Sequence, residues 1–381
     1  MRTRTVALAG LAGGAGATAA LVRRRQQNGG VQGAGHSTHS AHSGHSGHSG
    51  HSGHSGHGVE NPAPEPQVTP VPPLEGRLHT VVTEDGVTLH VEEHGPANAT
   101  ATLVLAHGYV QSSRLWAGQV RDVLAARPDL RVVVYDHRGH GRSGRTTRET
   151  AHLEQLARDL VAVFDTVAPT GPVVLGGHSM GGMTIMALAE QRPELFGDRV
   201  VGAAFVATSS GELGDVTYGM PKPAAALFKL MTPRLNERAL RREQAGKART
   251  VAPGTARMIF GLAADPEHVR ETLEDMTGCS AETVAYFHAT FSDHDRRAAL
   301  VAMAEVPAVV LVGDRDLLCP LPHSQAIAAE LPLAELTIYP GAGHMVQLER
   351  RAEVSRRIVA LLDRAVPRQS GVRAWLAGVQ A

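Results

Sequence analysis

The sequence predicts an α/β protein whose core is a mostly parallel β-sheet with helices on both faces. Uninterrupted apolar runs, such as TLVLAH from Thr102 and PVVLGG from Pro172, are typical of strands buried on both faces. Segments with helical periodicity lie between such runs, notably HLEQLARDLVAVFDTV from His152 and MGGMTIMALAEQ from Met180. Because strands that alternate with helices form parallel βαβ units, these observations together predict one layered sheet.

The remaining strands follow from the same patterns. Residues 77–83 and 87–94 alternate apolar with polar side chains around the turn EDG, which predicts an antiparallel hairpin. Further buried strands are expected in LRVVVYD from Leu130, VVGAAFVAT from Val200, VPAVVLVG from Val306 and LAELTIYP from Leu333. A final helix is expected from residue 348 to about residue 366.

The alternation is interrupted between residues 211 and 305, which contain helical stretches and no convincing strand. Loops at the carboxyl edge of a parallel sheet can grow without disturbing its core, so we expect this insertion to form a helical cap there. The core domain would then comprise residues 76–210 and 306–367, followed by a tail at 368–381. Large apolar side chains of the cap are candidates to line an acyl pocket, although helical spacing alone assigns most of them to a core: Met220, Phe228, Met231, Met258, Phe260, Tyr286 and Phe287.

The first 25 residues are expected to form a hydrophobic anchor or signal segment. Residues 6–22 are uncharged and have arginines on both sides. As a helix they would span roughly 26 Å, slightly less than the about 30 Å of a bilayer core. The arginines that follow at once favour an uncleaved membrane anchor over a cleaved signal, and an unstructured tail is the third alternative. A membrane-anchored or secreted protein is therefore expected, with the side of the membrane open.

Residues 26–75 are expected to be a disordered tether, because HSG repeats and a proline-rich run supply almost no large apolar side chains. The histidines between His36 and His57 recur every third residue. In a polyproline-like helix this period places them about 9 Å apart, too far for neighbours to share one ion. We therefore favour a passive spacer over a metal binder and assign no metal site.

Composition excludes several other classes. Lys plus Arg and Asp plus Glu number 37 each, so no basic excess would attract nucleic acid. The cysteines, Cys279 and Cys319, are far apart in sequence and are expected to be unpaired thiols. The hydrophobic fraction of 43% in 381 residues is enough for the core of a folded enzyme.

The motif GHSMG, residues 177–181, carries the strongest chemical signal because it stands directly between a buried strand and a helix. Such a strand-to-helix turn exposes the hydroxyl of Ser179, and the glycines on either side allow the chain to turn tightly. The helix that starts there offers the free N–H of Met180 to a developing oxyanion. Ser179 is thus the predicted nucleophile.

A nucleophilic serine needs a base and an acid that orients the base. GDRD follows the strand that ends at Val312, and GAGH follows the strand that ends at Tyr339. His344 is therefore the predicted base and Asp316 the predicted acid. Asp314 competes for the acid role, but it directly follows Gly313 and is better explained as a turn residue.

The second oxyanion donor is expected in AHGYVQSS, after an early strand, and is assigned to the backbone N–H of Tyr109. The motif DHRGHGRS, residues 136–143, is interpreted as a structural turn held by Asp136 and Arg138. Cys319, three residues after Asp316, is expected to neighbour the site rather than to act in it.

Together, HGY, DHRGHGRS, GHSMGG, GDRD and GAGH in this order resemble the α/β-hydrolase superfamily over about residues 77–366. The chain is similar in particular to the capped serine esterase, lysophospholipase and monoacylglycerol-lipase-like branch, and to its N-terminally anchored actinobacterial members. The resemblance implies an eight-stranded sheet with a lid, no cofactor, and acyl transfer through a serine ester. Serine at position 179 argues against dehalogenases and epoxide hydrolases, and the single HG argues against the hormone-sensitive-lipase-like branch.

The expected function is hydrolysis of a carboxylic ester, with an apolar, lipid-like small molecule as substrate. Hydrolysis of C–C bonds, amides or lactones and cofactor-free haloperoxidation use the same triad and remain alternatives. A rival of another class is a non-catalytic binding protein on a hydrolase scaffold, but such proteins usually lose the serine or the histidine.

Overall fold

The structure is a computed structural model in which residues 76–368 are described. The predicted anchor at 1–25, the tether at 26–75 and all but the first residue of the predicted tail lie outside the described residues. Membrane anchoring and localisation therefore stay predictions. Of the helices between residues 76 and 368, none combines the length and the apolar character needed to cross a bilayer.

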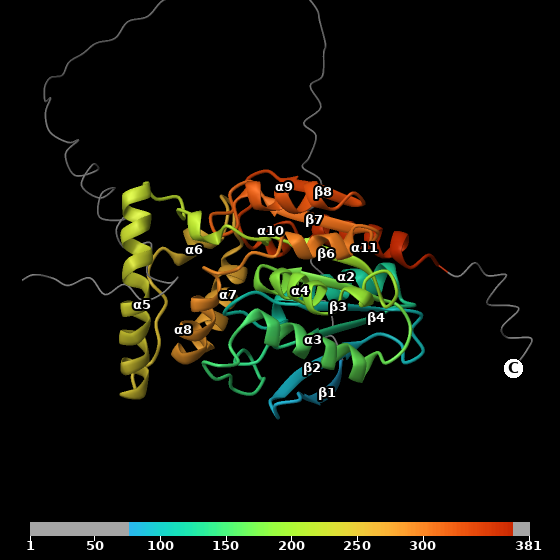
Figure 1. Cartoon of the computed structure of the whole chain (residues 1–381), viewed down its shortest axis with the longest axis horizontal. Helices are drawn as coiled ribbons and strands as arrows, with labels where there is room; N and C mark the ends of the chain where they lie inside the picture. The colour runs from blue at the N-terminus through green and yellow to red at the C-terminus, as the bar shows by residue number, and fades with distance from the viewer. Residues whose placement is uncertain (1–75, 369–381) are drawn as a thin grey trace, which may run out of the picture. The chain divides into compact units, whose positions relative to one another are not determined.

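An eight-stranded sheet forms the core, in the order β1-β2-β4-β3-β5-β6-β7-β8 (Figure 1). The six parallel strands are β3 (Thr102–Ala106), β4 (Arg131–Tyr135), β5 (Val173–His178), β6 (Val200–Val206), β7 (Ala308–Gly313) and β8 (Ala334–Tyr339). The antiparallel hairpin of β1 (Arg77–Val82) and β2 (Thr88–His94) joins them through β4. These strands confirm the mostly parallel sheet that the apolar runs predict.

Helices cover both faces of this sheet. α3 (Leu153–Val167) and α4 (Met180–Gln191) pack together on one face, and α2 (Ala117–Ala126) and α11 (Arg351–Ala365) pack together on the other. α9 (Leu321–Glu330) packs against β7 and β8. The predicted helices at 152–167 and 180–191 are present, whereas α2 and α9 are additions that the sequence patterns did not indicate.

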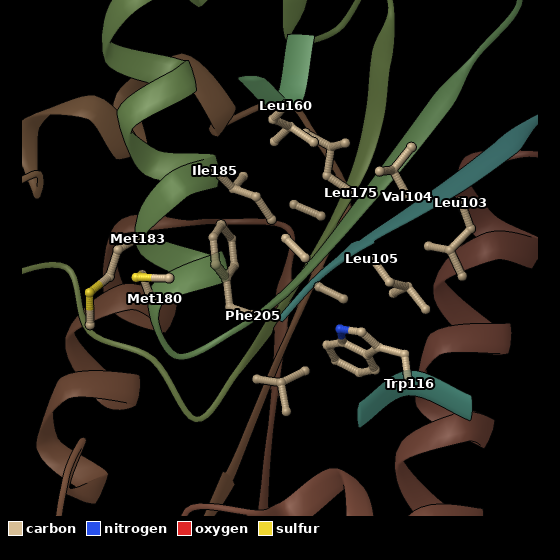
Figure 2. Close-up of a cluster of buried hydrophobic side chains, with 14 of the residues drawn as sticks. Leu103, Val104, Leu105, Trp116, Leu160, Leu175, Met180, Met183, Ile185 and Phe205 are labelled. Carbon is tan, nitrogen blue, oxygen red and sulfur yellow. The ribbon is translucent and has the colours of Figure 1, made fainter. Parts of the chain in front are cut away.

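The core is split by the sheet because side chains alternate along each strand. Figure 2 shows Leu103 and Leu105 directed toward Trp116 on one face, while Leu175 and Phe205 meet Ile185 of α4 on the other. Trp116 is the last residue of a short 3₁₀ helix, Ser113–Trp116, and its side chain is fully buried. Apolar layers on both faces fix the sheet, so the loops at its carboxyl edge start from rigid strand ends.

The cap lies between β6 and β7, as expected, and is helical in all its regular structure among the described residues. Its helices are α5 (Lys222–Gln244), α6 (Thr255–Ile259), α7 (Pro266–Gly278) and α8 (Ala281–Thr290). The chain enters and leaves the cap at one point, because the N–H of Arg296 donates to the carbonyl of Ser210 at 2.7 Å. His294 Nε2 donates to the carbonyl of Ser209 at 2.8 Å beside it. These two bonds form a neck between the cap and the sheet.

The end of the domain differs from the prediction. Instead of one helix from residue 348, the chain forms α10 (Val346–Glu349) and then α11, separated at Arg350. Arg350 has φ −129° and ψ 43°, outside the helical region. The break has a structural consequence, because it leaves the side chain of Glu349 directed at the backbone of two other segments.

Candidate active site

Ser179 stands at the sharp turn between β5 and α4. Its backbone has φ 50° and ψ −115°, an unfavourable conformation for a residue with a side chain. The turn is held because the Ser179 N–H donates to Val206 at 3.0 Å and its carbonyl accepts from Thr208 Oγ1 at 2.7 Å. A Cβ at Gly181 would lie 2.3 Å from the carbonyl oxygen of Ala106, so only glycine fits there. The predicted role of the motif glycines thus has a direct steric cause.

Asp316 and His344 meet at the carboxyl edge of the sheet. His344 Nδ1 and Asp316 Oδ2 are 2.8 Å apart, and both side chains are buried. Since a carboxylate can only accept, Nδ1 carries the proton and Nε2 of the neutral ring is free to accept one. The other oxygen, Asp316 Oδ1, accepts from the N–H groups of Leu318 at 2.8 Å and Cys319 at 2.9 Å. The acid therefore has a fixed orientation toward the histidine.

The competing acid, Asp314, has a different environment. It is exposed, and its Oδ1 accepts from the N–H of Gly341 at 2.7 Å. Asp314 therefore binds the backbone of the loop that carries His344, and it contacts this loop at Gly341 rather than at the His344 ring. This is the contact of a turn residue. Of the two carboxylates, Asp316 is the one that contacts the His344 ring.

Ser179 and His344 both line one cavity of about 460 Å³. No hydrogen bond joins their side chains within residues 76–368. The hydroxyl of Ser179 instead lies within hydrogen-bonding reach of the Cys319 thiol, whose pKa is raised by burial. Catalytic hydrogen bonds are often loose before a substrate is bound, so the shared cavity is compatible with proton transfer.

The loop after β3 passes close to Ser179. A Cβ at Gly108 would lie 2.6 Å from His178 Nδ1 and 3.3 Å from Ser179 Cβ. Tyr109, the next residue, lines the cavity, and its hydroxyl donates to the carbonyl of Val284 in the cap at 2.5 Å. Within the described part of the chain, neither the Tyr109 N–H nor the Met180 N–H donates to another group. Tyr109 therefore borders the cavity, whereas Met180 follows Ser179 and is not itself a lining residue.

Buried histidines fix this loop. His107 Nδ1 donates to the carbonyl of Gly108 at 2.7 Å, and its Nε2 accepts from the N–H of His137 at 2.9 Å. Burial lowers the pKa of both rings, and it lowers the pKa of His140 to about 3. These neutral rings hold the loop in place and are not directed into the cavity.

The DHRGHGRS turn has the structural contacts that the sequence analysis expects. Asp136 accepts from the N–H of Ser113 at 2.7 Å and from that of Arg142 at 2.8 Å. Arg138 is buried and donates to both Asp159 and Asp85 at 2.6 to 2.9 Å. The turn therefore connects the β1–β2 hairpin to α3.

Two residues near His344 were not singled out from the sequence. His178 Nε2 donates to the carbonyl of His344 at 3.0 Å, and the two rings are 4.7 Å apart. Glu349 bridges two segments, because Oε1 accepts from Gly343 at 2.9 Å and Oε2 accepts from Gly261 of the cap at 2.8 Å. The spacing of a glutamate five residues after the histidine is visible in the sequence, but its two partners become visible only in the fold.

The cap closes the cavity with mainly apolar side chains. Of the candidates, Phe228 and Met258 line it, whereas the others lie outside its lining: Met220, Met231, Phe260, Tyr286 and Phe287. The lining residues that the sequence analysis did not name include Met276, Phe291 and Gln111. Among the described residues that line the cavity there is no arginine, aspartate or glutamate, and the one lysine, Lys229, donates to the carbonyl of Gly214.

Other titratable clusters do not suggest a resident metal. Between residues 76 and 368, no group of three or more His, Cys, Asp or Glu side chains is arranged to hold an ion. Cys279 and Cys319 are both buried free thiols, which confirms the prediction of unpaired cysteines. The histidine repeat at 36–57 lies outside the described residues.

A serine on a strand-to-helix turn, an acid and a histidine on later strand ends, and a helical cap after β6 together define an α/β-hydrolase. Residues 97–351 match the family described as serine aminopeptidase, S33. This match spans more than half of the chain, and the chain therefore belongs to this family. It is a serine hydrolase with an esterase-like fold.

The proteins that are similar to this chain in sequence include an acetyltransferase component and a hydrolase. The chain is 28% identical over 269 residues to the dihydrolipoyllysine-residue acetyltransferase component of an acetoin cleaving system from Pseudomonas putida, covering 68% of this chain and only 63% of that relative. It is 26% identical over 291 residues to a 2-hydroxy-6-oxononadienedioate/2-hydroxy-6-oxononatrienedioate hydrolase from Burkholderia vietnamiensis, covering 74% of this chain and 94% of the relative.

Among solved structures, the chain is similar to a thermophilic esterase from Thermogutta terrifontis. The TM-score is 0.56 at 24% identity, and the match covers 76% of this chain and 99% of the esterase. At this identity the similarity establishes the fold and leaves the substrate open.

Proposed function

We propose that this protein hydrolyses carboxylic esters with an apolar acyl or alcohol part, through an ester formed on Ser179. The observation that carries the proposal is that Ser179 and His344 border one cavity of about 460 Å³, and that His344 Nδ1 lies 2.8 Å from Asp316 Oδ2. A serine becomes nucleophilic when a neutral histidine oriented by a carboxylate can take its proton.

The mechanism assigns one role to each group. Ser179 Oγ attacks the ester carbonyl while its proton passes to His344 Nε2, and Asp316 stabilises the resulting imidazolium. The N–H groups of Tyr109 and Met180 would hold the negative oxygen of the tetrahedral intermediate. His344 then gives the proton to the leaving alcohol. Water repeats the sequence on the acyl ester and releases the carboxylic acid and free Ser179.

The lining of the cavity supports an apolar substrate. The relative named after a dienedioate acts on a dianion, which arginine or lysine side chains would be expected to bind. In this chain, Lys229 is the only such group among the described lining residues, and the remainder is mainly aliphatic, aromatic and methionine side chains. A small dicarboxylate would therefore leave at least one of its two charges without a cationic partner, at a large cost in free energy.

A fluorophosphonate probe tests the nucleophile. It should label the wild-type protein covalently, and the label should be lost in Ser179→Ala while the circular dichroism spectrum is unchanged. Labelling that persists in Ser179→Ala would refute the assignment. A matched control is Ser292→Ala, since Ser292 also lines the cavity but lies in the cap.

A panel of p-nitrophenyl esters from short to long acyl chains tests the substrate class. We expect kcat/KM to rise with chain length until the cavity is filled. The alternatives of C–C, amide or lactone hydrolysis and haloperoxidation share the triad, so amide, lactone and C–C substrates should be compared in the same assay. Faster turnover of one of these would replace the ester proposal without affecting the assignment of Ser179.

A further inference from the structure

The outer face of the cap helix α5 carries an unusual combination of side chains. Leu227, Leu230 and Met231 are 60%, 64% and 39% exposed, near the start of the helix. Arginines continue the same exposed stripe toward its end, at positions 234, 238, 241 and 242. Steps of three or four residues link these positions, and the adjacent pairs 230/231 and 241/242 lie on either side of that row, so all of them are on one side of the helix. We call this stripe, residues 227, 230, 231, 234, 238, 241 and 242, the outer stripe.

The opposite face of the same helix belongs to the cavity. Ala225, Phe228, Thr232 and Asn236 are buried, and Phe228 and Thr232 line the cavity. In Figure 1, α6, α7 and α8 all lie on one side of α5, between it and the sheet. One helix therefore separates the substrate cavity from an exposed apolar and cationic surface.

The charge of this helix is locally unbalanced. α5 contains six basic and two acidic residues, whereas the whole chain has equal numbers of basic and acidic residues. Arg241 pairs with Glu237 at 3.5 Å, but within the described residues Arg234, Arg238 and Arg242 have no ion-pair partner. Unpaired guanidinium groups beside exposed leucines match a partner that is both anionic and apolar.

We propose that the outer stripe binds the surface of an anionic phospholipid bilayer. Leu227, Leu230 and Met231 would enter the boundary between headgroups and acyl chains, and the arginines would lie against lipid phosphates. A helix that combines apolar side chains with cations on its exposed side lies along such an interface. The proposal extends the proposed function, because an apolar ester dissolved in the bilayer would then reach the cavity beside α5.

A fluorescent label on the stripe tests the proposal. In the full chain, Leu230→Cys is labelled with an environment-sensitive dye; Cys279 and Cys319 are buried, so the introduced thiol reacts selectively. Leu78→Cys is the matched control, because Leu78 is 68% exposed on the edge strand β1. Vesicles of phosphatidylcholine alone and of phosphatidylcholine with phosphatidylglycerol are compared.

The label at position 230 should shift to the blue with the anionic vesicles and be quenched by brominated acyl chains, while the label at 78 should not. Arg238→Gln/Arg242→Gln should weaken binding of the labelled stripe to anionic vesicles by about tenfold or more, since each such cation contributes on the order of 1 kcal/mol near the surface. A double change elsewhere, Arg145→Gln/Arg192→Gln, should have little effect.

Three results would overturn the proposal. The first is an equal response of the labels at 230 and 78. The second is a response at 230 that does not depend on phosphatidylglycerol. The third is a response that appears without lipid as protein concentration rises, which would identify a second copy of the chain as the partner. The fluorescence is measured without substrate, so these outcomes are independent of whether Ser179 is the nucleophile.

Discussion

Two regions of the molecule meet over the cavity, and they are built differently. At the carboxyl edge of the sheet, Asp316 and His344 are 3% and 4% exposed, and each is held by several hydrogen bonds. The cap contributes apolar side chains such as Phe228 and Met276, which make shape rather than directed bonds. The difference indicates that the sheet edge determines the chemistry, whereas the cap determines which molecule undergoes it.

The largest expected effect tests the sheet edge. Asp316→Asn should lower kcat by a factor of about 10⁴, because the amide stabilises the wrong tautomer of His344 and no imidazolium is stabilised. Asp314→Asn, two residues away, should lower kcat by less than about tenfold, since Asp314 contacts only backbone. The measurement is kcat on a p-nitrophenyl ester. Equal losses in the two variants would contradict the distinction between the carboxylates.

The second effect concerns the free energy of unfolding at acidic pH, to which the buried ring of His140 contributes. Burial lowers the pKa of His140 to about 3, below its value of 6.5 in the unfolded chain. The unfolded state therefore binds more protons between these values, so stability is present above pH 6.5 and is lost as the pH falls toward 3. From pH 6.5 to 5 the loss from this residue should be about 2 kcal/mol.

Urea unfolding at pH 7 and pH 5 measures this loss. His140→Gln cannot be protonated, so the variant should lose about 2 kcal/mol less than the wild type over the same interval. Parallel changes in the two proteins would show that His140 does not contribute to acid sensitivity.

The third effect tests a contact between the two regions. Glu349 accepts from Gly343, next to His344, and from Gly261 of the cap. In Glu349→Gln one of these N–H groups faces an amide that donates rather than accepts, and we expect kcat to fall about tenfold. KM for a short ester should change little. Glu353→Gln, at an exposed position of α11, is the control, and an equal fall there would argue against a positioning role.

The smallest effect tests the cap alone. Phe228→Ala removes apolar surface from the cavity, so kcat/KM for long acyl esters should fall about fivefold and that for acetate esters should hardly change. Leu227→Ala, the exposed neighbour, should leave both rates on soluble esters unchanged. A uniform loss across chain lengths would indicate that Phe228 supports the fold of the cap rather than selecting the acyl chain.

The sequence carries a local signal for each part of the sheet edge. The strand positions follow from apolar runs; Ser179 stands directly after one such strand, and Asp316 and His344 stand three and five residues after the ends of two others. The tight turn at Ser179 is also local, since it depends on neighbouring glycines. Each of these features is set by residues close together in the chain, so each can be inferred separately without the fold.

The cap and the connecting contacts could not be predicted for the opposite reason. Phe228 and Phe287 have similar helical contexts, but one lines the cavity and the other is fully buried in the core. Which of them faces the substrate depends on how α5 and α8 pack. Glu349 likewise acquires its role from Gly261, a residue 88 positions earlier in the chain.

The neck of the cap has a practical consequence. Ser210 and Arg296 are joined by one backbone hydrogen bond of 2.7 Å, although the cap helices α5, α6, α7 and α8 lie between them in the chain. At the neck the two ends of this segment lie side by side. Away from the neck the segment also contacts the catalytic edge, because Gly261 donates to Glu349 and the carbonyl of Ile259 accepts from the N–H of His344 at 2.8 Å. Chimaeras that exchange this segment with that of another hydrolase at these two positions, and that keep the backbone contacts to Glu349 and His344, would keep the triad geometry and acquire a different substrate range.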